Sequence, residues 1–286
     1  MLKQRILTAA VLLAVFVAAL AAPTPALFLA LTLLLIAAAG WEWSRLVGWP
    51  GWRAWASGAL CAALGLAAWL TRRFDDAPGA WRVLWFAASL CWIIGGAWLL
   101  RRGVAHWPRL PRLLRWSLGM AMLIVTWLAL AQALGRGVNF LLSALVLVWA
   151  ADTAAYFCGR ALGGKLTGGR KLAPAISPGK SWEGAAGGFI GVLLTGAIWI
   201  AVDRAYSLSP SLYSILWQRG LVWFGGGLAL LTAMSIVGDL TESLVKRAAG
   251  VKDSSALLPG HGGVLDRVDA LLPTLPLALL IISVPI

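Results

Sequence analysis

The chain has 286 residues, of which 60% are hydrophobic and only 12% are charged, and its formal net charge is +13. Soluble globular domains carry about 25% charged residues, so this composition excludes an ordinary water-soluble domain and is typical of a membrane protein. In a membrane protein, the positive charge indicates cytoplasmic loops and anionic lipid headgroups rather than nucleic acid.

Apolar runs recur along the whole chain. A helix of about 20 apolar residues crosses the hydrocarbon core of a bilayer, and continuous runs exclude the alternating pattern of a membrane β-barrel. We therefore expect an all-α, polytopic membrane protein with about nine transmembrane helices. The predicted spans are Ile6–Ala22, Ala26–Gly40, Ala54–Leu70, Trp81–Leu100, Trp116–Leu134, Val138–Phe157, Gly184–Val202, Gly220–Ile236 and Ala270–Val284.

The first run has a second interpretation. Met1–Pro23 begins with basic residues and ends with small ones, as a secretory signal peptide does. Another apolar run follows almost at once, which favours a membrane helix. The three cysteines show no CxxC spacing, so we expect neither a disulfide nor a metal role for them.

Basic residues are distributed unevenly among the predicted loops. With the N-terminus in the cytoplasm, most of the 24 Lys and Arg residues fall on the cytoplasmic side. The exceptions are Arg72, Arg73, Arg82, Arg136, Arg204 and Arg219. Because an excess of Lys and Arg marks cytoplasmic loops, we expect a multi-pass protein of the cell inner (cytoplasmic) membrane.

Acidic residues divide the chain into two parts. Seven of the eleven cluster around the polar segments 151–183 and 235–269, and these are Asp152, Glu183, Asp239, Glu242, Asp253, Asp266 and Asp269. The other four lie in or beside predicted loops, and we assign them no role: Glu42, Asp75, Asp76 and Asp203. We therefore expect a single membrane domain over 1–286, with scaffold helices in 1–137 and the chemistry in 138–286.

Segment 235–269 carries two pairs of carboxylates. A helix over Ser235–Arg247 places four polar residues on one face: Asp239, Glu242, Ser243 and Lys246. Asp266 and Asp269 repeat the three-residue spacing at the start of the last apolar run. Carboxylates at a membrane edge are costly unless they bind a cation or pair with bases.

These acids have two readings. Carboxylates without His or Cys companions favour Mg²⁺, which also binds substrate phosphates. The alternative is that they only neutralise the neighbouring bases, Lys246, Arg247, Lys252 and Arg267.

Two turns could hold phosphate groups. In Leu258–Gly263, the glycines permit a positive φ and a close approach of the backbone to a ligand. His261 either donates to a phosphate or braces the loop. In Ser177–Lys180, Pro and Gly shape the turn while Ser and Lys supply a donor and a charge. An ordinary basic cytoplasmic loop is the alternative for this second turn.

The stretch Ser243–Asp269 resembles the signature of the phosphatidate cytidylyltransferases, S-x-x-K-R-x-x-x-x-K-D followed by P-x-H-G-G-x-x-D-R-x-D, at every fixed position. Asp152–Gly184 is similar to another stretch of that family, with D-T-x-A-Y, G-R, I-S-P-x-K and E-G. Ser181 stands where the family usually has Thr, and the stretch between Gly159 and Leu172 is longer than usual. It stays open which basic residue there contacts the substrate: Lys165, Arg170 or Lys171.

The resemblance implies transfer of a cytidylyl group from CTP to phosphatidic acid, giving CDP-diacylglycerol and pyrophosphate at a site that faces the cytoplasm. It implies Mg²⁺, with a second cation left open. The implied ligands are Asp239 and Asp266, supported by Glu242 and Asp269. The implied phosphate-neutralising residues are Lys246, Arg247, Lys252 and Arg267. Other implied binding residues are Asp152, Ser177, Lys180, Ser243, His261, Gly262 and Gly263. Nucleic acid is not implied as a partner, and a homodimer is left open.

Three other functions stay open on the sequence. A related membrane transferase could use a different lipid phosphate, such as a polyprenyl phosphate, or a different nucleotide. A transporter could couple its intramembrane carboxylates to cations, but its polar groups would be expected in both halves of the chain. A purely structural membrane protein would not need the spaced Lys, Asp and His-Gly-Gly positions.

Overall fold

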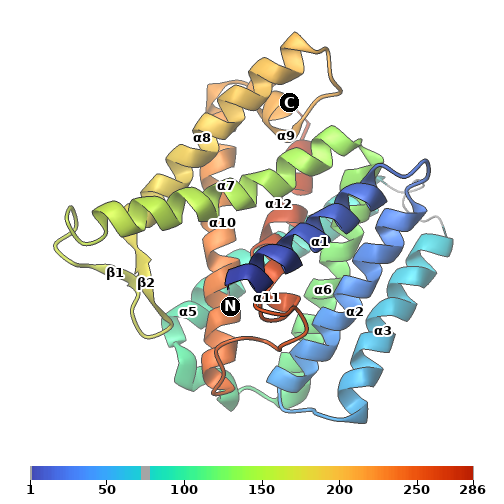
Figure 1. The fold of residues 1–286 in the computed structure, drawn as a ribbon, viewed down its shortest axis with the longest axis vertical. Helices are drawn as coiled ribbons and strands as arrows, with labels where there is room; N and C mark the ends of the chain where they lie inside the picture. Colours follow the sequence, from blue (N-terminus) through green and yellow to red (C-terminus); the bar gives the residue numbers. More distant parts are fainter. Residues whose placement is uncertain (1, 72–77, 286) are drawn as a thin grey trace.

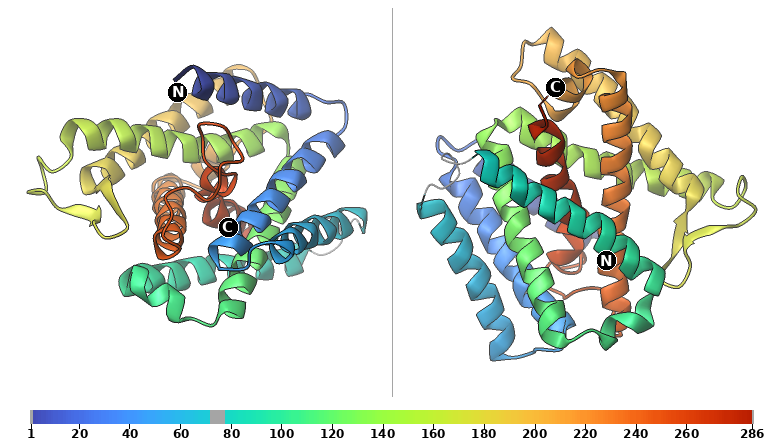
Figure 2. Two further views of the ribbon diagram at one scale, coloured as in Figure 1. Left: turned by 60° about the horizontal axis from the view of Figure 1, so that its bottom comes forward. Right: turned by 180° about the vertical axis from the view of Figure 1, so that it is seen from behind.

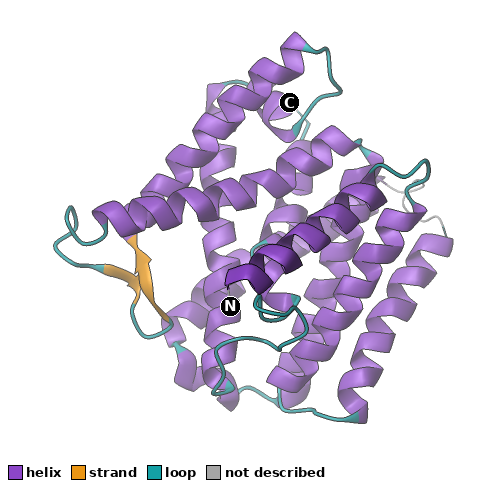
Figure 3. Cartoon of the chain, in the orientation of Figure 1, coloured by secondary structure: helices purple, strands orange, loops and turns teal. Residues whose placement is uncertain are grey.

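The structure, a computed structural model, describes residues 2–71 and 78–285. They form helices joined by short loops, with one small hairpin (Figures 1 and 3). The elements are α1 (Leu2–Leu20), α2 (Ala26–Leu46), α3 (Trp52–Leu70), α4 (Pro78–Leu90), the π-helix η1 (Cys91–Gly96), α5 (Ala97–Arg102), the 3₁₀-helix η2 (Val104–Arg109), α6 (Arg112–Gly135), α7 (Val138–Leu162), β1 (Lys171–Ala173), β2 (Ser177–Ser181), α8 (Trp182–Ala205), α9 (Leu212–Gln218), α10 (Leu221–Ala248), α11 (Leu265–Val268) and α12 (Leu271–Ser283). The prediction of an all-α, polytopic membrane protein is confirmed.

The count of about nine spans is not confirmed. Among the described residues, seven helices are long and apolar enough to cross a membrane. The candidate spans are Ala26–Leu46, Trp52–Leu70, Gly79–Arg102, Arg112–Gly135, Val138–Leu162, Trp182–Ala205 and Leu221–Ala248. The first and last predicted spans also form helices, but neither is among these seven, and the apolar part of α1 is Ile6–Leu20. With 13 residues, α12 is about 20 Å long, less than the hydrocarbon core of about 30 Å.

The short helix α12 lies at the centre of the bundle. It packs against α4, α6 and α10 (Figure 2). Nearly all of its side chains are buried. Gly238 of α10 makes this contact close, because a Cβ added there would lie 2.5 Å from the carbonyl oxygen of Asp269. That close approach brings Asp239, the next residue of α10, beside the start of α12.

Helices α7 and α8 form a close pair that projects from the bundle and carries the hairpin at its end (Figure 1). Small residues allow the pair to close. A Cβ added at Gly187 would lie 2.3 Å from the Cβ of Cys158, and one added at Gly191 would lie 2.4 Å from the Cβ of Ala154. Contacts of this kind between small residues are typical of membrane helices.

The hairpin was not expected from the sequence. Strands β1 and β2 pair antiparallel, and β2 leads directly into α8. Ser181 is the N-cap of α8, since its Oγ accepts a hydrogen bond of 3.1 Å from the Gly184 N–H. Ser177–Lys180, which we expected to form a turn, therefore belongs to strand β2, directly before a membrane helix.

Candidate active site

A polar cavity of about 620 Å³ gathers the two polar segments of the sequence. Its walls come from α7, the hairpin, α8, α10 and the loop before α12. Predicted site residues that line it are Asp152, Ser177, Lys180, Asp239, Lys246, Asp266, Arg267 and Asp269. Segments 151–183 and 235–269 are thus two walls of one site.

An ion pair joins the hairpin to α10. The Lys180 ammonium on β2 pairs with the Asp239 carboxylate, and Ser243 donates to the other oxygen of Asp239 at 3.3 Å. The side chains of Lys180 and Asp239 remain 26% and 30% exposed. Because both partners are in contact with the cavity, Lys180 is available to a phosphate group that enters it.

A second, buried set of ion pairs lies one turn further along α10. The Lys246 ammonium lies 2.6 Å from Glu242 Oε2 and 2.5 Å from Asp266 Oδ1. Removing one partner of a buried ion pair leaves an uncompensated charge, which is strongly destabilising. Glu242 and Asp266 therefore act as counter-ions of Lys246 in this structure.

Asp266, which lies in α11 outside the candidate spans, also holds the preceding loop. Its Oδ2 accepts hydrogen bonds from Ser254 N, Ser254 Oγ and Gly263 N at 2.8–2.9 Å. Burial alone raises the pKa of Asp266, but hydrogen bonds from Lys246, Gly263 and Ser254 outweigh it and lower the pKa to about 2. The carboxylate is therefore ionised and has partners on both oxygens.

Close packing around this loop explains two glycines of the signature. Gly262 has a φ of 80°, and a Cβ there would lie 2.8 Å from an oxygen of Asp266. A Cβ on Gly263 would lie 2.1 Å from Ser254 Oγ and 2.3 Å from Glu42 Oε1. Because these two glycines have no side chain, the carboxylates of Asp266 and Glu42 can lie close to the backbone of the loop. The Gly263 N–H donates its hydrogen bond to Asp266. The predicted contact of the two glycines with substrate phosphate stays a prediction.

Glu42, which the sequence analysis left without a role, lies inside the protein against this loop. Its side chain is fully buried on α2. It accepts hydrogen bonds from Leu265 N at 2.6 Å, Val264 N at 2.9 Å and Ser255 Oγ at 2.5 Å. Glu42 therefore caps α11 from a helix more than two hundred residues earlier in the chain.

A longer predicted helix would have identified Glu42. The predicted span ended at Gly40, whereas α2 continues to Leu46. An acidic residue inside a membrane helix is a functional candidate by default.

Three carboxylates of the polar cavity are close enough to influence one another. Burial and the charges of Asp239 and Asp152 raise the pKa of Asp269, which precedes α12. Even so, no three His, Cys, Asp or Glu side chains in the described ranges are arranged to hold a metal ion by themselves. Of the predicted metal ligands, Asp239, Asp266 and Asp269 line the cavity, while Glu242 and Asp266 pair with Lys246.

Three basic residues that were predicted to neutralise phosphate lie around the loop between α10 and α11. Arg267 donates to the carbonyl oxygen of His261 at 2.6 and 3.1 Å and so braces the loop. Arg247 is exposed and donates to Val251 O at 3.1 Å. Lys252 is also exposed. These positions leave their predicted contact with substrate untested.

Arg160 lines the polar cavity, although it was not among the predicted site residues. It lies in the last turn of α7 and donates to Tyr156 OH at 3.2 Å. The candidates named for the longer loop do not line this cavity: Lys165, Arg170 and Lys171. The loop is held instead by Glu183, which accepts from Thr167 Oγ1 at 2.8 Å.

Comparison with known proteins shows the family of the chain. A model of the Cytidylyltransferase family matches residues 3–284. The chain belongs to the cytidylyltransferase family. It is 38% identical to the phosphatidate cytidylyltransferase of Pseudomonas aeruginosa over 281 residues, which are 96% of this chain and 95% of that protein.

Other members of the family show similar identity. The phosphatidate cytidylyltransferase of Haemophilus influenzae is 37% identical over 297 residues, covering 96% of each chain. The phosphatidate cytidylyltransferase of Bacillus subtilis is 41% identical over 140 residues, covering 49% of this chain and 46% of the relative.

The position of Glu42 generates a prediction. Glu42→Ala removes the acceptor of two buried backbone N–H groups, and each buried donor without a partner costs about 1–3 kcal/mol. We expect the amide hydrogens of Val264 and Leu265 to exchange faster with solvent in hydrogen–deuterium exchange. We also expect turnover to fall about tenfold or more, because the loss of these hydrogen bonds would displace Asp266.

Arg45→Ala is the matched control, because Arg45 lies one turn along α2 with its side chain exposed. It should leave exchange at Val264 and Leu265 as in the parent. Unchanged exchange in Glu42→Ala would show that the loop does not depend on Glu42.

Proposed function

We propose that the chain transfers a cytidylyl group from CTP to phosphatidic acid, which yields CDP-diacylglycerol and pyrophosphate. The observation that carries the proposal is the shared polar cavity, because both signature segments line it with cationic and anionic groups. Membership of the cytidylyltransferase family, and similarity to phosphatidate cytidylyltransferases over nearly the whole chain, support the same reaction.

The reaction needs positioning and charge neutralisation. A phosphate oxygen of the lipid forms a bond to the α-phosphorus of CTP, and the bond from that phosphorus to the bridging oxygen breaks. Its electron pair leaves with pyrophosphate. Lys180, Arg160 and Arg267 line the cavity and would bind the phosphate oxygens. Catalysis of this kind requires no covalent protein nucleophile.

A divalent cation fits the carboxylates of the cavity. We assign Asp239 and Asp269 as its protein ligands, because Mg²⁺ is commonly held by one or two carboxylates together with substrate phosphates. When bound, Mg²⁺ would neutralise charge that develops on the departing pyrophosphate. Asp266 would not bind the cation but would hold Lys246 and the loop in position. Whether a second cation binds stays open.

The site would face the cytoplasm from the cell inner membrane, where CTP is available. The uneven distribution of Lys and Arg supports this orientation. One chain contains both signature segments, so the proposed chemistry needs no second copy. The homodimer stays a prediction.

The reaction can be tested with a purified sample in detergent. Pyrophosphate should form only when CTP or dCTP, phosphatidic acid and Mg²⁺ are all present. Equal turnover with ATP, or turnover without lipid, would contradict the proposal. Preference for a polyprenyl phosphate over phosphatidic acid would instead indicate a related transferase.

Two substitutions distinguish a metal ligand from an organising carboxylate. Asp269→Asn should lower kcat/KM at least about a hundredfold, since a positioned metal contributes several kcal/mol. Higher Mg²⁺ should restore part of this loss. Asp266→Asn should lose at least as much at every Mg²⁺ concentration and should also lower the melting temperature, because Lys246 loses a partner.

Asp253→Asn is the control for both, because Asp253 is exposed at the cavity edge and should have a smaller effect. A parental Mg²⁺ dependence in Asp269→Asn would remove Asp269 from the metal site. Near-parental activity in a folded Asp266→Asn protein would show that Asp266 is dispensable for the site.

Orientation can be measured with single cysteines in a background without Cys61, Cys91 and Cys158. Gly179 lines the polar cavity, Ala256 lies in the loop after α10, and both are exposed, so each can be replaced by cysteine. We expect both to be shielded from an impermeant thiol reagent in intact cells. Tyr206→Cys, in the loop after α8, should be labelled from outside. The opposite pattern would reverse the proposed orientation.

A further inference from the structure

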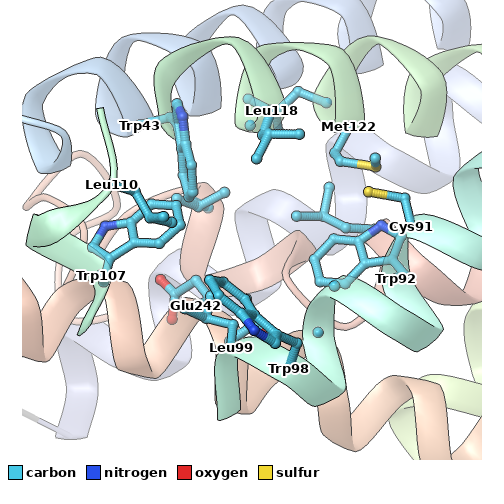
Figure 4. A pocket seen from close by; sticks show the side chains of 17 residues that line it. Trp43, Cys91, Trp92, Trp98, Leu99, Trp107, Leu110, Leu118, Met122 and Glu242 are labelled. Atoms are coloured by element: carbon cyan, nitrogen blue, oxygen red, sulfur yellow. The ribbon is translucent and has the colours of Figure 1, made fainter. Parts of the chain in front are cut away.

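A second cavity, of about 150 Å³, lies between η1, α5, η2, α6 and α10 (Figure 4). Its walls are almost wholly apolar and rich in tryptophan, with Trp43, Trp92, Trp98, Trp107 and Met122 among the side chains that surround it. It shares no lining residue with the polar cavity. We call it the apolar cavity.

The apolar cavity extends from the outer surface of the bundle towards its interior. At one end its lining includes Trp98 and Leu118, which are 40% and 37% exposed on candidate membrane spans. At the other end it reaches Leu265 and Glu242, which are buried. Because the exposed end lies on helices that face lipid, a hydrocarbon chain could enter from the bilayer.

The inner end lies next to the polar cavity. Glu242, which lines the apolar cavity, is bonded to Lys246, and Lys246 is bonded to Asp266. Lys246 and Asp266 line the polar cavity, and Leu265 of the apolar cavity is the residue before Asp266. The two cavities are therefore separated only by the Glu242–Lys246 and Lys246–Asp266 ion pairs. A phospholipid could have its phosphate on one side of these ion pairs and an acyl chain on the other.

Some side chains around the apolar cavity carry buried polar atoms. The indole N–H groups of Trp92 and Trp107 and the Oε1 of Glu242 have no hydrogen-bond partner in the part of the chain that the structure describes. Buried donors are nearly always paired, so such groups require an explanation. The carboxylate of Glu242 would repel a phosphate, so the phosphate group belongs in the polar cavity and not in the apolar one.

We infer that the apolar cavity receives a segment of one acyl chain of the phospholipid substrate while its phosphate lies in the polar cavity. This inference rests on the proposed function. Apolar cavities of about 150 Å³ stay dry and bind a molecule the size of benzene, so the volume suits part of a chain. The π-helix η1 forms one wall, and π-helical turns are frequent at functional sites.

Gly95 offers a way to fill the cavity. It lines the cavity, and a Cβ added there would meet only Cys91 Sγ, at 3.9 Å. Gly95→Leu should therefore occupy space that the acyl chain uses. We expect the KM for dioleoyl phosphatidic acid to rise about tenfold or more, because two or more methylene groups lose their contacts. The KM for CTP should stay near the parental value, and dibutyryl phosphatidic acid should be affected less.

Gly226→Leu is the matched control, since it makes the same change in α10 where an added Cβ meets nothing within 4 Å. It should preserve both KM values. Equal KM changes for long and short lipids in Gly95→Leu, or no change, would overturn the inference. Absence of turnover in the parent would instead overturn the proposed function.

A binding measurement on the parent protein is independent of turnover and of variant folding. Phosphatidic acid with a photoactivatable group in the first half of one acyl chain should label peptides containing Trp92 or Met122. Unlabelled phosphatidic acid should compete, and phosphatidylcholine should not. Equal competition by both lipids would identify an ordinary structural lipid and overturn the inference, as would labelling elsewhere only.

Discussion

The rest of the site depends on the ion pairs that the buried ammonium group of Lys246 forms with two carboxylates. Its two carboxylate partners come from α10 and from α11, so the ion pairs attach the C-terminal loop to the longest helix of the bundle. Asp266 then uses its second oxygen to hold Ser254 and Gly263. A buried charge that loses one partner is strongly destabilising, so the positions of α10, the loop and α11 are energetically linked.

The same loop is held from its other side by the N-terminal half of the chain. Glu42 on α2 accepts hydrogen bonds at the start of α11, and Thr8 on α1 donates to Pro259 O at 3.0 Å. The glycines of the loop are needed because these carboxylates approach the backbone so closely. The segment 1–137, which we expected to serve as scaffold, therefore helps to shape the catalytic loop directly.

The sequence predicted the helical membrane fold and both polar segments, because apolar length and residue spacing are local properties. It did not identify the roles of Glu42 and Asp203, which we had placed in or beside loops. Glu42 caps α11, and Asp203 accepts hydrogen bonds from the hydroxyl groups of Ser211, which is the N-cap of α9, and of Ser214. Short helices carry too little periodicity to detect, and their partners lie on other helices. The metal assignment also depends on such long-range geometry, since spacing alone gave Asp266 and Asp269 equivalent positions.

A membrane enzyme with a charged phosphate and long acyl chains in one substrate must keep ions and hydrocarbon close together without mixing them. Helix α10 separates the two environments here. Asp239 and Lys246 face the polar cavity, whereas Thr241 and Glu242 face the apolar one. Charge next to hydrocarbon is costly unless it is paired, and the Glu242–Lys246 pair lies at this boundary. The ion pairs of Lys246 therefore have two effects: they stabilise the loop, and they neutralise the charge that would otherwise lie next to the apolar cavity.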